Sequence, residues 1–110
     1  MFCDHRQDDY DAFPSPPRRR AVWIYHPRQG IGCGAESAVV SYPQEIALTS
    51  LSPDVQVVLL VGVANTWLEA EELDGADGAC GFFALHGKAP RAKIRLEGDI
   101  PSAVRAVAWL

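Results

Sequence analysis

Residues 55–64 read VQVVLLVGVA, the longest apolar run in the chain. β-Branched residues favour strands, and a strand that is apolar on both of its faces belongs in the middle of a fold, covered on both sides. The run has about half the length of a membrane-spanning helix, which needs roughly 18 to 20 apolar residues. We therefore predict a central core strand here, and no transmembrane segment.

Five further runs have the β-branched and aromatic residues of strands, and each is bounded by Gly, Pro, Asp or Asn. They are AVWIYH (21–26), SAVVSY (37–42), TWLEAEEL (66–73), ACGFFALHG (79–87) and RAKIRLE (91–97). Two other segments are ambiguous. QEIALTSL (44–51) suits either a helical turn or a strand, and residues 102–110 suit a short helix capped by Ser102 or, as we favour, a seventh strand.

At 110 residues the chain can bury one core. We predict one all-β domain over residues 21–110, an antiparallel β-sandwich or small barrel of six to seven strands. Residues 1–20 end in FPSPPRRR, where the prolines favour extended backbone. We interpret this segment as an irregular proline-rich arm, either disordered or laid over a partner.

The last three runs carry opposite charges on their polar faces. Residues 66–73 present acidic side chains and residues 91–97 present basic ones. If 66–73, 79–87 and 91–97 form a meander, these faces lie on one sheet surface, separated by the intervening strand, and complement each other. The charges would then be structural.

The composition indicates a folded protein, with 48% hydrophobic and 22% charged residues. The net charge is -4, and an acidic body as a whole does not attract nucleic acid or anionic membrane. The N-terminus has no apolar core of a secretory signal. Three cysteines without short spacing argue against a disulfide framework and favour reduced thiols. We expect a cytoplasmic protein.

The stretch HPRQGIGCG (26–34), followed by Ala35, matches the letters of the G-x-G-x-x-A dinucleotide-binding fingerprint. That motif needs a helix to open at its last small residue, so that the helix N-terminus can hold the pyrophosphate. Here the strand-like ESAVVSYP follows instead. We interpret the stretch as a glycine-rich turn between strands.

Cys33 and His26 are candidates for a thiolate and its base, but no third residue that would orient them can be named. Six residues could in principle bind a metal, yet none has the close pairwise spacing that zinc sites use. They are Cys3, His5, His26, Cys33, Cys80 and His86. The acidic residues between 69 and 77 are those expected on solvent-exposed strand faces and in turns. We expect no cofactor, no metal and no catalysis.

The segment RRRAVWIYHPR mixes arginines with aromatic residues, a combination that protein interfaces prefer. The candidate partner-binding residues are Arg18, Arg19, Arg20, Trp23, Tyr25 and Arg28. Our leading hypothesis is a non-catalytic protein-protein interaction module. It would be an inhibitor of a larger complex, of the kind that phages or mobile elements encode, or a small assembly subunit that also self-associates through a sheet edge.

Two alternatives from other classes stay open. The first is a nucleic-acid-binding β-barrel that uses the arginine and aromatic residues of segment 18–28. An overall isoelectric point near 5.2 makes it less favoured than a protein partner. The second is a small enzyme or metalloprotein built on Cys33 and His26.

Overall fold

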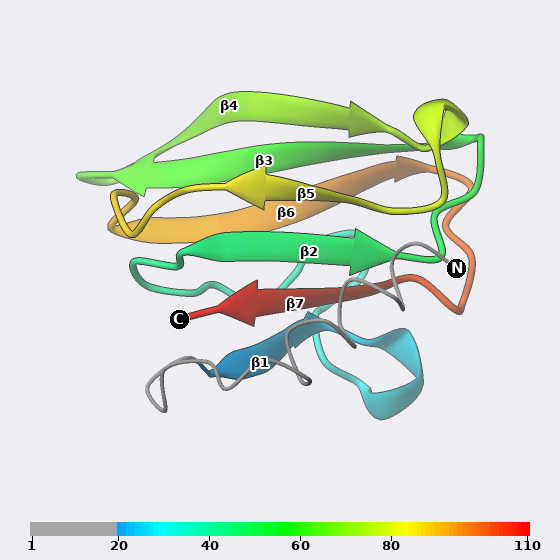
Figure 1. Ribbon diagram of the computed structural model, residues 1–110, viewed down its shortest axis with the longest axis horizontal. Coiled ribbons are helices and arrows are strands. Elements are labelled where there is room, and N and C mark those ends of the chain that lie inside the picture. The colour runs from blue at the N-terminus through cyan, green and yellow to red at the C-terminus, as the bar shows by residue number, and fades with distance from the viewer. Residues whose placement is uncertain (1–19) are drawn as a thin grey trace, which may run out of the picture.

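A computed structural model describes residues 20–110 of the protein (Figure 1). Within this part the regular elements are strands and two short 3-10 turns, without an α-helix. The strands are β1 (Ala21–Tyr25), β2 (Glu45–Thr49), β3 (Val55–Val63), β4 (Thr66–Asp74), β5 (Gly81–Ala84), β6 (Arg91–Gly98) and β7 (Arg105–Trp109), and the turns are η1 (Pro27–Gln29) and η2 (Gly75–Asp77). The predicted all-β class is confirmed. The predicted arm, up to residue 19, lies outside the described residues.

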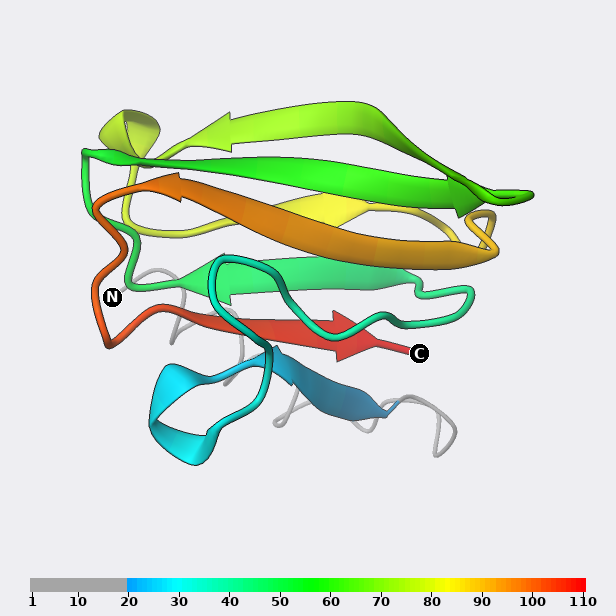
Figure 2. The same ribbon diagram turned by 180° about the vertical axis from the view of Figure 1, so that it is seen from behind.

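The strands form two antiparallel sheets that pack face to face (Figures 1 and 2). The first sheet has four strands in the order β1-β7-β2-β5, and the second has three in the order β4-β3-β6. Of the two predicted architectures, the sandwich is therefore confirmed, and the closed barrel is wrong. Among residues 20–110, no helix has the length and apolar character to cross a membrane.

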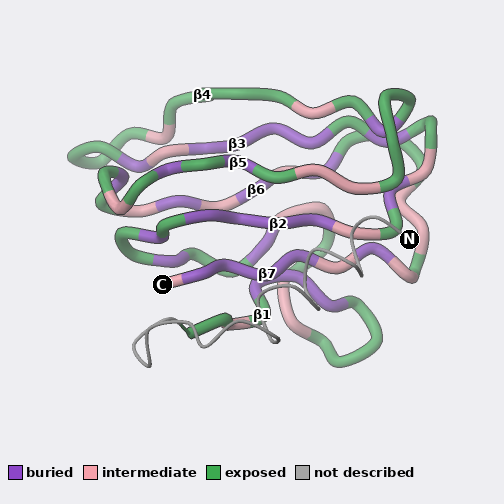
Figure 3. The backbone as a smooth tube through the Cα atoms, viewed as in Figure 1, coloured by how far each residue is buried: buried purple, intermediate pink, exposed green. Residues whose placement is uncertain are grey.

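The run that opened the sequence analysis is β3, the middle strand of the second sheet. Val55, Val57 and Leu59 alternate toward the core between the sheets and are almost fully buried. Val58 and Leu60 point to the outer face of the same sheet, yet they are also buried, at 2% and 4% exposure. Figure 3 shows β3 buried along most of its length, whereas its neighbour β4 is exposed. The prediction of a strand covered on both faces is confirmed.

The core consists of the inward-facing residues of both sheets. From the first sheet come Ile24, Ile46, Leu48, Phe83, Ala106 and Ala108, and from the second Val55, Val57, Leu59, Ala92, Ile94 and Leu96. On β6 this matches the period of two that the sequence showed, because Ala92, Ile94 and Leu96 are buried while the residues between them are partly exposed. Burial of these side chains is the main favourable contribution to folding.

The two ambiguous segments are both strands. Residues 45–49 form β2, which pairs with β5 on one side and β7 on the other. Residues 105–109 form β7, so the favoured strand over residues 102–110 is confirmed. The predicted strand 79–87 is shorter than expected, because β5 covers only residues 81–84.

The predicted meander of the last three runs is wrong. β5 belongs to the first sheet, where it pairs with β2, while β4 and β6 lie on either side of β3 in the second. Glu69 of β4 and Arg95 of β6 nevertheless share one sheet surface, where they form an ion pair. The strand between them is β3 rather than β5.

The predicted strand 37–42 is an irregular segment that joins the two sheets (Figure 2). At its start the Ser37 amide donates a hydrogen bond to the Ile94 carbonyl of β6, and the next amide, that of Ala38, donates to the Ile24 carbonyl of β1 in the first sheet. Farther along, Val40 exchanges two backbone hydrogen bonds with Ala92 of β6. With this segment counted beside β6, the strand order of the two sheets is that of a jelly roll.

Candidate functional site

The outer face of the first sheet carries a row of apolar side chains that crosses all four strands. The strand register places Trp23 beside Val107, Val107 beside Ala47, and Ala47 beside Phe82. Their sequence neighbours Ile24, Ala106, Ile46 and Phe83 belong to the core, so these four residues point away from it. We call Trp23, Val107, Ala47 and Phe82 the aromatic row.

The two ends of the aromatic row are its exposed parts. Trp23 on edge strand β1 is 41% exposed, and Phe82 on edge strand β5 is 44% exposed. Val107 and Ala47 lie between them and are buried. The Trp23 ring meets His26 edge-on, with 5.1 Å between ring centroids, which limits the orientations of the indole. The row therefore brings one aromatic ring to the surface at each edge of the sheet.

The predicted partner-binding residues are separated by the structure. Arg18 and Arg19 lie outside the described residues. Arg20 is exposed beside the end of β7, where its carbonyl accepts a hydrogen bond from the Leu110 amide, and Arg28 is exposed on η1. Trp23 lies between these two arginines in the sequence and is the first residue of the aromatic row.

Tyr25, the other aromatic candidate, is buried at 4% exposure, unlike Trp23. The pairing of β1 with β7 shifts register between Trp23 and Tyr25, and this bulge turns Tyr25 toward the core. Its hydroxyl donates a 3.0 Å hydrogen bond to the Gly34 carbonyl. Burial raises the pKa of Tyr25 above its usual value.

The stretch HPRQGIGCG is a turn, as predicted. Gly30, Gly32 and Gly34 all have positive φ, and no α-helix follows. Gly32 has a second requirement, because a Cβ there would lie 2.7 Å from the Tyr25 ring. The loop is thus folded around Tyr25 and has no helix N-terminus that could bind phosphate.

The Cys33 and His26 pair does not form a linked site in residues 20–110. Cys33 is a free, exposed cysteine, whereas His26 is buried with its Nδ1 lacking a hydrogen-bond partner. Cys80 is disulfide-bonded, so the prediction of reduced thiols is wrong for this residue. In the described part of the chain, no group of three or more His, Cys, Asp and Glu side chains is placed to hold a metal ion. Cys3 and His5 lie outside it.

The outer face of the second sheet has a different chemistry. Arg95 of β6 reaches over β3 to Glu69 of β4 at 2.9 Å and also pairs with Glu97 at 3.0 Å. These hydrogen bonds, first to Glu69 and then to Glu97, raise the pKa of Arg95 further above its usual value. On the same face, Val58 and Leu60 of β3 lie between these charged strands.

Trp67 of β4 is held by two cations from β6. The Arg91 guanidinium lies 4.9 Å and the Lys93 ammonium 4.5 Å from the centre of its ring. Lys93 also pairs with Glu36 at 2.9 Å, and Arg91 donates a 2.6 Å hydrogen bond to the Ala64 carbonyl. The apolar stems of such side chains cover the surface beneath them, which explains the burial of Val58 and Leu60. We call this surface the charged face.

Phe82, Val107 and Ala47 are the residues of the row that sequence reasoning missed. Alternation in the GFFA and RAVAW runs indicates that one of each neighbouring pair points outward. It does not indicate that the two strands belong to one sheet with β1.

Comparison with known proteins gives no family for this chain. No protein-family model matches it, and no curated protein is significantly similar to it.

Proposed function

We propose that the chain is a non-catalytic protein-binding module, and that its contact surface is the aromatic row with Arg20 and Arg28 beside it. The observation that supports this most is the pair of exposed aromatic rings, Trp23 and Phe82, at the two ends of a row of apolar side chains. Exposed apolar patches on soluble domains mark interaction surfaces. Trp and Arg are also the residues that most often dominate binding energy.

The kind of partner remains the one expected from the sequence. The module would inhibit a larger complex, as proteins of phages and mobile elements do, or serve as a small subunit of an assembly. In the second case Arg18 and Arg19 would add contacts to the same partner, and self-association would be expected. A cytoplasmic location also stays a prediction, although disulfides such as that of Cys80 are rare in that compartment.

The nucleic-acid alternative is not favoured by the site geometry. Stacking on single strands requires exposed aromatic rings in series along a basic groove. The burial of Tyr25 leaves Trp23 as the exposed ring between Arg20 and Arg28.

The test is capture of the partner by a photo-cross-linking amino acid at position 23 of the full chain, in lysate of the source cells. Position 42 is the matched control, because Tyr42 is also an exposed aromatic residue, at 59%, but lies away from the aromatic row. We expect one protein to be cross-linked from position 23 and not from position 42, in high salt as in low salt.

A second arm uses substitutions. Trp23→Ser should abolish capture of that protein in a pull-down, whereas Tyr42→Ser should leave it unchanged. Equal capture by both variants would contradict the proposal. Recovery of nucleic acid alone, released by salt, would replace it with the nucleic-acid reading.

A further inference from the structure

β4 is an edge strand with an open side. It pairs with β3 along its length, and no strand of residues 20–110 pairs with its other edge. It has nine residues, of which all but Trp67 and Leu73 are exposed (Figure 3). A strand edge presents unpaired backbone amides and carbonyls at regular spacing, which an extended segment can use.

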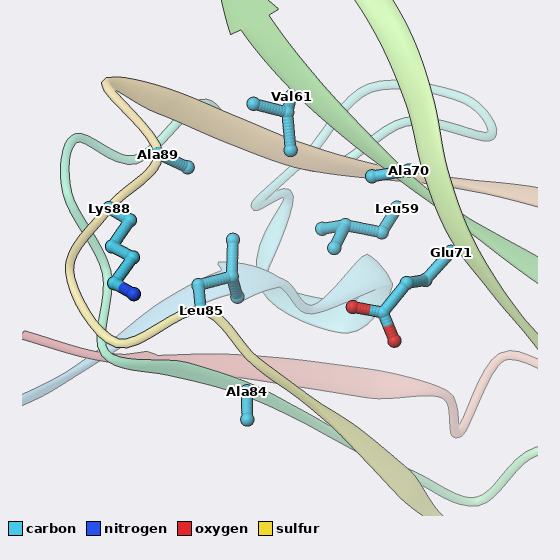
Figure 4. Close-up of a pocket in the computed structure, with 8 residues that line it drawn as sticks. All are labelled: Leu59, Val61, Ala70, Glu71, Ala84, Leu85, Lys88 and Ala89. Carbon is cyan, nitrogen blue, oxygen red and sulfur yellow. The ribbon is translucent and has the colours of Figure 1, made fainter.

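The open edge of β4 borders a cleft between the two sheets (Figure 4). At one end of this side the sheets close, because Leu73 of β4 packs against Gly81 of β5 so tightly that a Cβ on Gly81 would lie 2.9 Å from it. Toward the other end there is a cleft of about 260 Å³, lined by Leu59, Val61, Ala70, Glu71, Ala84, Leu85, Lys88 and Ala89. The register places Leu68 on the same face as Val61, and Leu68 is 52% exposed. The core is thus accessible here to an added apolar side chain.

The charge of this edge indicates what could be added. β4 carries Glu69, Glu71, Glu72 and Asp74 and no basic residue. Glu69 is paired with Arg95, but Glu71 and Glu72 form no ion pair with any residue between 20 and 110. Figure 4 shows the Glu71 carboxylate directed into the cleft, with Lys88 on the other side.

A bulge concentrates these carboxylates. The pairing with β3 shifts between Leu59 and Leu60. Glu71 lies opposite Leu59 and Glu69 lies opposite Leu60, so Ala70 is the extra residue of the bulge. A second hollow of about 150 Å³ lies at the bulge and is lined by residues 69–72. Basic side chains on an added strand would find acceptors on both sides of Ala70.

We propose that the open edge of β4 takes up an extended segment of a partner protein as an added strand, with an apolar side chain in the cleft near Glu71 and Lys or Arg side chains on the outer face near Glu72. Main-chain hydrogen bonds would provide affinity and the cleft would select the apolar residue. The carboxylates would attract basic strands and repel acidic ones. They also disfavour pairing of β4 with β4 of a second copy, because both edges are acidic. The proposal concerns a different surface from the aromatic row and does not depend on it.

The test measures binding of two labelled peptides to the full chain by fluorescence anisotropy. One peptide alternates valine with lysine (TKVKVKT), and the other alternates valine with glutamate (TEVEVET). We expect the lysine peptide to bind about tenfold or more tightly than the glutamate peptide. Glu71→Lys combined with Glu72→Lys should reverse this preference, and binding of the glutamate peptide would show that the variant is folded.

Two controls separate an added strand from general attraction of charge. Asp54→Lys with Asp99→Lys makes the same change in net charge at exposed positions outside β4, and should leave the preference unchanged. Two methylated forms of the lysine peptide are compared, one with the odd-numbered and one with the even-numbered backbone amides methylated. Only one of the two forms should lose binding, because alternate amides face the neighbouring strand. A reversal by the Asp variant, or equal binding of both methylated peptides, would overturn the proposal.

Discussion

The outer faces of the two sheets meet solvent in opposite ways. On the charged face, long side chains from β4 and β6 reach across β3 and cover its apolar residues, so Val58 and Leu60 are buried although they point outward. On the first sheet the row across β1, β7, β2 and β5 is apolar from end to end, and its aromatic ends are exposed. On the charged face, long charged side chains lie over the apolar centre, whereas the aromatic row reaches the surface at its two ends, Trp23 and Phe82.

The difference comes from the width and flanks of each sheet. A three-stranded sheet places every central residue next to two edge strands, and here those flanks carry opposite charges that can meet above the centre. The four-stranded sheet has two central strands, and their outward residues are Val107 and Ala47 at the centre, with Glu45, Thr49, Arg105 and Trp109 on either side of them.

The largest expected effect concerns an apolar residue that lies under the charged face. Leu60→Ala should lower the free energy of unfolding by roughly 2–5 kcal/mol, because Leu60 is packed as tightly as a core residue. Leu68→Ala is the matched control on the neighbouring strand. Since Leu68 is 52% exposed, we expect a change of about 0.5 kcal/mol or less. Urea denaturation measures both, and equal losses would show that the charged face is not sealed.

The next prediction concerns the bulge that separates Trp23 from Tyr25. At neutral pH, Tyr25→Phe should cost about 1 kcal/mol, the value of a buried hydrogen bond, through loss of the bond to Gly34. Burial raises the pKa of Tyr25, so the folded state holds the phenolic proton more tightly than the unfolded state. The resulting stabilisation is complete below the unfolded pKa of about 10 and is lost as the pH rises above it.

Thermal unfolding between pH 8 and about pH 11 checks this pH dependence. The wild-type protein should lose stability more steeply than Tyr25→Phe above about pH 10. Tyr42→Phe, at an exposed tyrosine, should follow the wild type. Parallel curves for the wild type and Tyr25→Phe would contradict the inferred role of burial.

A smaller effect is expected at the hairpin that joins β3 and β4. Ala64 has φ of 56°, a conformation that costs an L-residue with a side chain more than it costs glycine. Ala64→Gly should therefore raise stability by roughly 0.5–1 kcal/mol. Ala76→Gly is the control, because Ala76 in η2 has no positive φ. This variant should lower stability by a similar amount. Destabilisation by both would exclude strain at the hairpin.

The smallest expected effect concerns the ion pairs of Arg95 on the charged face. Arg95→Gln removes the ion pairs with Glu69 and Glu97, and exposed pairs contribute little to stability. We expect a small fall in Tm at low salt that disappears at about 1 M salt, where charges are screened. A loss that is independent of salt would mean that the stem of Arg95, rather than its charge, covers β3.

The local sequence pattern is sufficient to predict two kinds of strand: those with one apolar and one polar face, and those that are apolar on both faces. β3 and β6 were predicted from their apolar run and their strict alternation, and Ala92, Ile94 and Leu96 are buried as expected. The glycine-rich turn was predicted for the same reason, since positive φ is a local requirement. Each of these features is determined by neighbours in the chain.

What depended on strands far apart in the chain was not predictable. Residues 37–42 alternate like a strand, but Ser37 and Val40 bond to β6 while Ala38 between them bonds to β1, so the segment contacts both sheets. Nothing local distinguishes that from a regular strand. Likewise β5 has a strand-like sequence, yet only its pairing with β2 places it in the first sheet.

The candidate site shows the same division. Trp23, Arg20 and Arg28 could be selected from composition, because aromatic and arginine residues in a polar setting suggest a surface. Tyr25 was assigned wrongly, because alternation assumes that no residue is inserted, and the bulge breaks it. Phe82 and Val107 become neighbours of Trp23 through the strand order alone.

The pairing of β1 with β7 has a consequence for how the chain reaches its native state. Ala21 lies beside Trp109, so the first described strand and the last one meet. Contacts between distant parts of a chain require large loops to close, and proteins rich in them fold slowly. On the ribosome, β1 must wait until all the other strands of the domain have been synthesised before β7 can join it. Until then Trp23 and Phe82 belong to separate, unfinished edges, and the protein is most exposed to aggregation during that interval.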